Sequence, residues 1–174
     1  MDRRGAAAGT VLFAATVPVT VAGLTPWWLA GRPAAPSATP LGARVVGATM
    51  IVGGSLLVGA SFVRFVRARG TPAPIAETEA LVAAGPYRFT RNPQYVGVLA
   101  VATGQACWWW SRPAGWYAVA LAGVFHTFVR IYEEPRLRRR FPAEYDRFTS
   151  EVPRWLWRSG VTRARRPPQG SAGR

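Results

Sequence analysis

The residues best placed to do chemistry lie in one short polar segment, residues 85–97, directly before an uncharged run. Gly85-Pro86 is a turn signal, and Pro93 disfavours helix at the residue before it while suiting a first helical turn, so we expect a helix to begin at Pro93 or Gln94. Free backbone N–H groups, the positive dipole end and nearby arginines would suit the carboxylate or phosphate of a small molecule. The alternative is anchoring at lipid headgroups, where Arg and Tyr also gather.

A second polar group consists of Glu133 and Glu134, about two helical turns after His126. An acidic pair in arginine-rich surroundings is expected either to neutralise nearby arginines or to bind a cationic or hydroxyl-rich ligand. His126 is the only histidine and lies in an apolar run, where a polar role and a packing role are both open.

Other chemistries find no support in the sequence. The single Cys107 excludes an intrachain disulfide and a cysteine metal site. We find no zinc-ligand spacing, no phosphate-binding glycine loop and no Ser/His/Asp arrangement. We therefore predict that the protein uses no metal.

Composition indicates a membrane protein of one domain. The chain has 174 residues, of which 49% are hydrophobic, and a formal net charge of +14 that comes from arginine without any lysine. The arginines flank apolar runs and do not line a polar fold, so we expect a lipid bilayer as partner and no nucleic acid. Exclusive use of arginine is typical of a GC-rich genome, and we expect a bacterial plasma membrane.

Four uncharged runs predict an all-α polytopic membrane protein with four transmembrane helices, over residues 6–29, 45–63, 94–111 and 114–129. The first run is longer than the apolar core of a signal peptide, so we expect it to be retained. Glycines in the second run would let another helix approach closely: Gly47, Gly53, Gly54 and Gly59, together with Ser55. A tight turn at Ser111-Arg112-Pro113 predicts an antiparallel hairpin of the last two spans.

The character of the chain changes after the fourth run. Residues 130–158 are amphipathic and charged, which predicts cytoplasmic helices lying on the membrane over about residues 132–151, interrupted at Pro142. Residues 1–158 would form the membrane domain, and residues 159–174 a disordered basic tail.

Arginine counts predict the orientation. Four spans place the two termini and the long connection on one side with 19 arginines, against three (Arg32, Arg44 and Arg112) on the other. The positive-inside rule makes the first side cytoplasmic. The tryptophans agree, since Trp27, Trp28, Trp116 and residues 108–110 fall at the outer interface.

Several motifs in order give the chain a resemblance to a known group of enzymes. The chain resembles the isoprenylcysteine carboxyl methyltransferase and phospholipid methyltransferase group of integral membrane enzymes over roughly residues 70–157. The similarity rests on six short stretches: Gly70-Thr71-Pro72-Ala73-Pro74, Gly85-Pro86-Tyr87-Arg88, Arg91-Asn92-Pro93-Gln94-Tyr95-Val96-Gly97, Tyr132-Glu133-Glu134-Pro135-Arg136-Leu137, Phe141-Pro142-Ala143-Glu144-Tyr145 and Val152-Pro153-Arg154-Trp155.

The resemblance implies that the cytoplasmic half of the hairpin and the segment after it bind S-adenosylmethionine, and that a lipophilic acceptor enters from the bilayer. Arg88 and Arg91 would face the methionyl carboxylate or an anionic acceptor, and Tyr87 or Tyr95 the sulfonium. The glutamate pair would face the ribose hydroxyls or the ammonium. The full set of expected cofactor-binding residues is Tyr87, Arg88, Arg91, Asn92, Pro93, Tyr95, Gly97, His126, Glu133 and Glu134, and the expected catalytic residues are Arg91, Tyr95 and Glu134.

Two positions depart from the family pattern. Members often have His where Asn92 stands and Gly where Pro142 stands. Asn92 can donate and accept hydrogen bonds but cannot carry a proton, which removes an acid or base role there. Two hypotheses follow: a membrane methyltransferase acting on a prenylcysteine-like carboxylate, a lipid amine or a small thiol, or a non-catalytic membrane scaffold or lipid-binding protein that keeps the fold.

Overall fold

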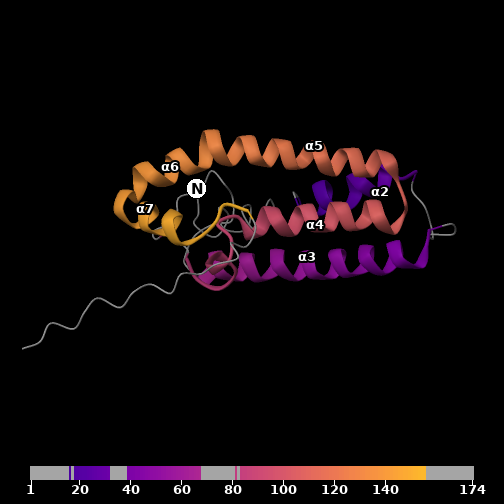
Figure 1. The fold of residues 1–174 in the computed structure, drawn as a ribbon, viewed down its shortest axis with the longest axis horizontal. Coiled ribbons are helices and arrows are strands. Elements are labelled where there is room, and N and C mark those ends of the chain that lie inside the picture. Colours follow the sequence, from indigo (N-terminus) through magenta and orange to yellow (C-terminus); the bar gives the residue numbers. More distant parts are fainter. Residues whose placement is uncertain (1–15, 17, 32–38, 68–80, 82, 156–174) are drawn as a thin grey trace, which may run out of the picture.

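The computed structural model describes residues 16, 18–31, 39–67, 81 and 83–155, and in that part of the chain every regular element is helical (Figure 1). The all-α prediction is confirmed. Residues 6–15 and 17 of the predicted first span and the whole predicted tail over residues 159–174 lie outside the described residues. In chain order the elements are η1 (Val19–Leu24), α2 (Thr25–Leu29), α3 (Leu41–Arg67), η2 (Gly85–Arg88), α4 (Pro93–Trp108), α5 (Arg112–Phe128), η3 (Val129–Glu133), α6 (Glu134–Arg140) and α7 (Pro142–Glu151).

Helices α3 and α4 form the closest helix pair, and glycines make the approach possible (Figure 1). A Cβ added at Gly54 would lie 2.6 Å from the carbonyl oxygen of Gly97, and one at Gly47 would lie 2.7 Å from that of Gly104. The two contacts recur at a seven-residue interval on both antiparallel helices, so the helices touch along a single seam. Of the glycines predicted to pack, Gly53 and Gly59 would have nothing within 4 Å of an added Cβ and do not face α4.

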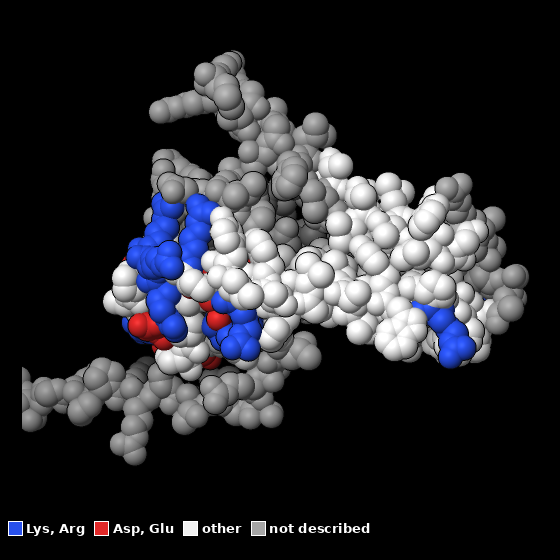
Figure 2. All heavy atoms as spheres, turned by 90° about the horizontal axis from the view of Figure 1, so that it is seen from above, with Lys and Arg blue, Asp and Glu red and all other residues white. Residues whose placement is uncertain are grey.

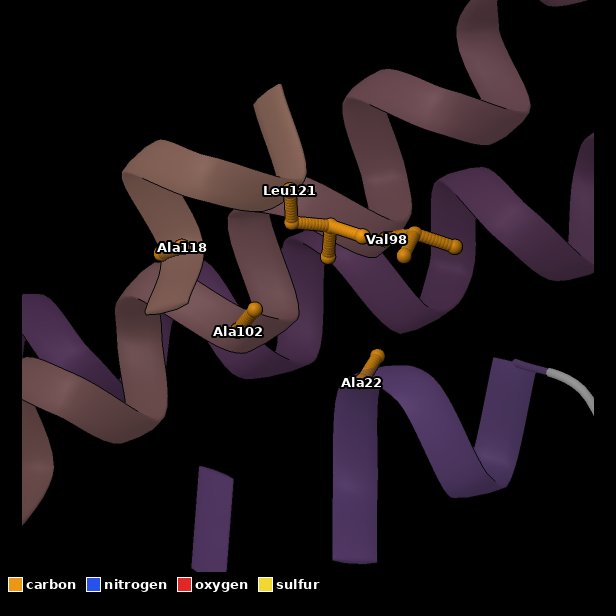
Figure 3. Packing of buried hydrophobic residues seen from close by; sticks show 5 residues of the cluster. All are labelled: Ala22, Val98, Ala102, Ala118 and Leu121. Carbon is orange, nitrogen blue, oxygen red and sulfur yellow. The ribbon is translucent and has the colours of Figure 1, made fainter. Parts of the chain in front are cut away.

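The apolar core lies between η1, α4 and α5. Its buried residues are small, which lets three helical segments converge, and Figure 3 shows their side chains directed toward one another: Ala22, Val98, Ala102, Ala118 and Leu121. Figure 1 shows α3, α4 and α5 extending side by side along the long axis, with α2 near the end where α4 turns into α5.

A proline disrupts the N-terminal helix, and the neighbouring helices compensate. Pro26 has no N–H, so it cannot donate to the carbonyls of Val21 and Ala22, and the helix widens to a π-helix over Val19–Leu24. Gln105 donates its side-chain amide to the Ala22 carbonyl. Tyr117 donates its hydroxyl to the Val21 carbonyl at 2.8 Å. Two side chains from the hairpin therefore satisfy the backbone groups that the proline leaves open.

The predicted hairpin of α4 and α5 is present. Helix α4 begins at Pro93, as predicted, but ends at Trp108, three residues before the predicted end of that span. Trp110 then adopts a left-handed backbone with φ of 51°, and the Ser111 side chain accepts a hydrogen bond from the Ala114 N–H, which caps α5.

The last long helix does not end where the fourth span was expected to end. Helical structure continues from Arg112 to Arg140 through the π-helix η3, so α6 prolongs α5 (Figure 1). The predicted interruption at Pro142 is confirmed, because Phe141 breaks the helix with a φ of −128° and ψ of 63° before α7. The change from apolar to charged residues near Arg130 was expected to mark the end of the helix. It did not predict that α6 continues from α5, because a helix does not have to end where its surroundings change.

Two helices are long and apolar enough to cross a membrane, Leu41–Arg64 and Arg112–Arg140, within the residues that the structure describes. Only 17% of each apolar window is buried, whereas the core helix of a soluble protein would be mostly covered. Helix α4, with 16 residues, is shorter and spans about 24 Å.

Candidate functional site

Most of the charged side chains visible in Figure 2 gather at one end of the molecule, with a smaller basic patch at the other end. Figure 1 places α6 and α7 at one end of the bundle. There a second apolar cluster holds η2 against the C-terminal segment through Tyr87, Tyr145, Phe148 and Val152, all at most 8% exposed. The polar segment at residues 85–97 and the segment after α7 are thereby fixed to each other.

Three hydrogen bonds join these segments at the start of α4. The Arg91 N–H donates to the Pro153 carbonyl at 2.9 Å. The Arg154 carbonyl accepts from the Thr90 hydroxyl at 3.1 Å and from the Asn92 side-chain amide at 2.9 Å. Asn92 is buried, and its amide has a positioning role that needs no proton transfer.

Glu134 is held by two arginines. Its Oε1 accepts from Arg91 Nη1 at 3.0 Å and from Arg154 Nε at 2.6 Å, and its Oε2 accepts from Arg154 Nη2 at 2.8 Å. The side chains of Arg91 and Glu134 are 14% and 18% exposed, so water screens this cluster only partly. Hydrogen bonding to Glu134 raises the pKa of Arg154, which keeps the guanidinium charged.

Glu133 has a different environment from its neighbour. Its Oε2 accepts a hydrogen bond from the Tyr95 hydroxyl at 3.0 Å. Within the described residues no arginine lies at ion-pair distance from Glu133. Burial, reinforced by the charge of Glu133, raises the pKa of Tyr87 well above its usual value, so Tyr87 stays a neutral phenol beside this carboxylate.

The aromatic surroundings of the cluster come from three elements. The rings of Tyr95 and Phe125 lie 4.7 Å apart between centroids. His126 stacks on Trp155 with centroids 6.0 Å apart, and its Nδ1 accepts a hydrogen bond from the Trp155 indole at 3.1 Å.

One further polar atom, Arg91 Nε, is buried without a hydrogen-bond partner among the described residues.

The structure brings most of the predicted site residues to one end of the bundle, but three of them have other surroundings. A Cβ added at Gly97 would meet Gly54 and Val58 of α3, so Gly97 has a packing role. Arg88 is exposed on η2, and Pro93 is buried in the first turn of α4.

Sequence reasoning missed one important member of the cluster, Arg154. It makes two of the three hydrogen bonds to Glu134 and its carbonyl holds Asn92. The available signal was its place in the Val152-Pro153-Arg154-Trp155 motif. No cluster of three His, Cys, Asp or Glu side chains able to hold a metal ion occurs in the described part of the chain.

Two apolar helices with largely uncovered faces indicate a membrane protein, and a polar Arg, Glu and Tyr cluster lies at one end of its helix bundle. The sequence matches the phospholipid methyltransferase family over residues 43–144, more than half of the chain, and the chain belongs to this family. This confirms the resemblance seen in the sequence. No curated protein and no solved structure matches the chain.

Proposed function

We propose that the protein is an S-adenosylmethionine-dependent methyltransferase whose acceptor is lipophilic and enters from the bilayer. Membership of a methyltransferase family supports the reaction type. The observation that carries the cofactor assignment is the contrast between the adjacent glutamates. Glu134 is neutralised by Arg91 and Arg154, whereas Glu133 has only the Tyr95 hydroxyl as a partner in the part of the chain that the structure describes.

A partly buried carboxylate without a counter-ion favours a cationic ligand. S-adenosylmethionine has two such groups, an ammonium and a sulfonium, and we assign one of them to Glu133. Tyr95 hydrogen-bonds to this carboxylate and Tyr87 lies within reach of its charge, and the neutral rings of both suit a cation as well. The donor set of the chain therefore fits the cofactor.

The arginines suit the carboxylate of the same ligand, which is bonded to the carbon that carries the ammonium. Arg91 has a buried Nε donor without a hydrogen-bond partner among the described residues, and Arg88 is exposed nearby in sequence, so both can meet the methionyl carboxylate. Glu134 then positions Arg91 and Arg154 and does not itself contact the cofactor. This revises the expected catalytic role of Glu134 to a positioning role, while Tyr95 and Arg91 keep direct roles.

When bound, S-adenosylmethionine supplies a methyl group activated by the sulfonium charge. The residues of the chain bind and orient the ligand and exclude water around it, and alignment of this kind can provide most of the rate enhancement of a methyl transfer. An acceptor that is already nucleophilic needs no base, which agrees with Asn92 at a position where the family often has His.

Calorimetry on the full-length protein in lipid nanodiscs tests the assignment, with S-adenosylmethionine as the titrant. Glu133→Gln keeps the side-chain shape and removes the charge, so we expect cofactor affinity to fall roughly ten- to a hundredfold, the equivalent of about 1.5 to 3 kcal/mol. The melting temperature without cofactor should stay unchanged. Glu151→Gln, which removes a carboxylate exposed on α7, is the matched control and should bind normally.

Wild-type protein that binds no S-adenosylmethionine in nanodiscs would favour the scaffold hypothesis. Binding that survives Glu133→Gln within about threefold would show that Glu133 is not part of the site.

A further inference from the structure

Outside the Arg91, Glu133 and Glu134 cluster, one face of η3 and α6 forms an open groove of about 650 Å³. The described residues that line it recur every four positions and thus form two adjacent rows on one helix face: Ile131, Tyr132, Pro135, Arg136, Arg139 and Arg140. The rows belong to the helix that continues directly from the apolar α5.

The chemistry of the groove changes along the helix axis. Nearest α5 the lining is apolar, with Ile131 exposed over 73% of its surface and Tyr132 over 39%. Two turns further on, about 12 Å along the axis, it consists of Arg139 and Arg140. Apolar contact at the membrane end and cationic contact beyond it match the two ends of a single lipid molecule.

The cationic end is suited to a phosphate. Arg136, Arg139 and Arg140 line the groove at this end. The guanidinium group of Arg136 lies over the Tyr132 ring at 5.8 Å and donates to its hydroxyl at 2.7 Å. Tyr132 brings no negative charge to either contact. Arginine binds phosphate oxygens through two parallel N–H donors, so it provides geometry as well as charge.

We propose that this groove binds one anionic phospholipid, with the acyl chains against Ile131 and the phosphate among the three arginines. The net negative charge of the lipid, which a zwitterionic lipid lacks, provides the selectivity. A lipid such as phosphatidylglycerol carries no amine, so it occupies the groove as an anchoring lipid and is not a methyl acceptor. Figure 2 shows the arginine side chains concentrated at this end of the molecule.

The test uses the full-length protein and intact-mass measurement of lipids retained on release from detergent. Phosphatidylglycerol and phosphatidylcholine with identical acyl chains are titrated separately. We expect tighter binding of phosphatidylglycerol to the wild type, and about fivefold weaker binding to Arg139→Gln, since one arginine near an anionic headgroup contributes about that factor.

Arg138→Gln is the matched control. Arg138 is the adjacent residue on the same helix, but it faces α7 and pairs with Asp146 at 3.0 Å. It should change phosphatidylglycerol binding less than about twofold, and Arg139→Gln should leave phosphatidylcholine binding unchanged. Excess inorganic phosphate should not displace the lipid, because it lacks the apolar contacts.

Equal losses in Arg138→Gln and Arg139→Gln would show a diffuse charge effect and overturn the proposal. Absence of a preference for phosphatidylglycerol, or its complete displacement by inorganic phosphate, would overturn it too. Cofactor affinity is independent of these outcomes, so failure here leaves the proposed methyltransferase function intact.

Discussion

At the scale of single residues, the positions of Glu133 and Glu134 show how one step along a helix separates two roles. Consecutive residues on a helix differ in direction by about 100°. Glu134 consequently meets Arg91 and Arg154, while Glu133 meets Tyr95 of α4. One carboxylate of the pair is therefore bound by arginines, and the other is the one that our proposed function assigns to the cofactor.

Glu134→Gln should lower stability. The substitution replaces an ionised acceptor of three hydrogen bonds and leaves two arginines, both less than one third exposed, without their counter-charge. We expect the free energy of unfolding to fall by about 1.5 to 3 kcal/mol. Thermal unfolding in detergent without cofactor measures this effect.

Arg147→Gln is the control for that loss. It removes an ion pair with Glu151 in which both side chains are more than half exposed, and it should cost only about 0 to 1 kcal/mol. Equal losses in the two variants would show that the Glu134 cluster contributes no more than a surface ion pair.

Sequence reasoning predicted that the two polar clusters meet but could not assign the contacts between their residues. Arg91, Tyr95, Glu133 and Glu134 come together because the turn before Pro93 and the residues that follow α5 lie at the same end of the bundle. Arg154 was missed because its contact depends on how α7 folds back after Phe141. The resemblance alone places Gly97 among the expected cofactor-binding residues, and its packing against α3 becomes visible only in the structure.

At the scale of elements, the seam between α3 and α4 determines where the site-bearing helix sits. Gly47 and Gly54 let the backbone of α4 approach so closely that an added Cβ would lie under 3 Å from a carbonyl oxygen. Lipid supplies no hydrophobic drive between helices, so close packing of this kind is the main source of association.

Gly54→Ala should therefore destabilise the protein, because the new methyl group would meet the rigid backbone at Gly97 and force the helices apart. Overpacking of this type costs about 1 to 3 kcal/mol. The neighbouring Gly53→Ala is the matched control, since nothing lies within 4 Å of the added atom. Helix propensity alone should make it neutral or stabilising by about 0.5 to 1 kcal/mol.

Unfolding in a graded series of denaturing detergent compares the two variants. If Gly54→Ala is as stable as Gly53→Ala, the helices can separate without cost and the seam does not hold them.

The elements themselves were largely predictable, and their junctions were less so. Apolar runs bounded by arginine gave α3 and α5, and Pro93 and Ser111 gave the start of α4 and the cap of α5. The continuation through η3 into α6 was not predicted, because a change from apolar to charged surface marks the edge of a membrane and not the end of a helix.

At the scale of the whole molecule, the distribution of arginine remains the basis for its orientation. The 19 to 3 arginine count predicts that both termini and the connection after α3 are cytoplasmic. Cysteine labelling in intact cells measures this, with Cys107→Ala as the background. We expect Ser37→Cys to react with an impermeant reagent from outside and Thr71→Cys to react only after the cells are opened.

Both labelling positions lie outside the described residues. Reaction of Thr71→Cys in intact cells would reverse the predicted orientation and place the Arg and Glu cluster on the outer face.

The π-helix before Pro26 has a consequence for how the protein is inserted into the membrane. In a bilayer the Val21 and Ala22 carbonyls cannot turn to water, and their donors, Tyr117 and Gln105, are synthesised 96 and 83 residues later. The first segment thus emerges from the ribosome before its partners exist. We expect it to remain close to the insertion machinery, shielded from lipid, until the hairpin arrives and the three segments enter the membrane as a unit.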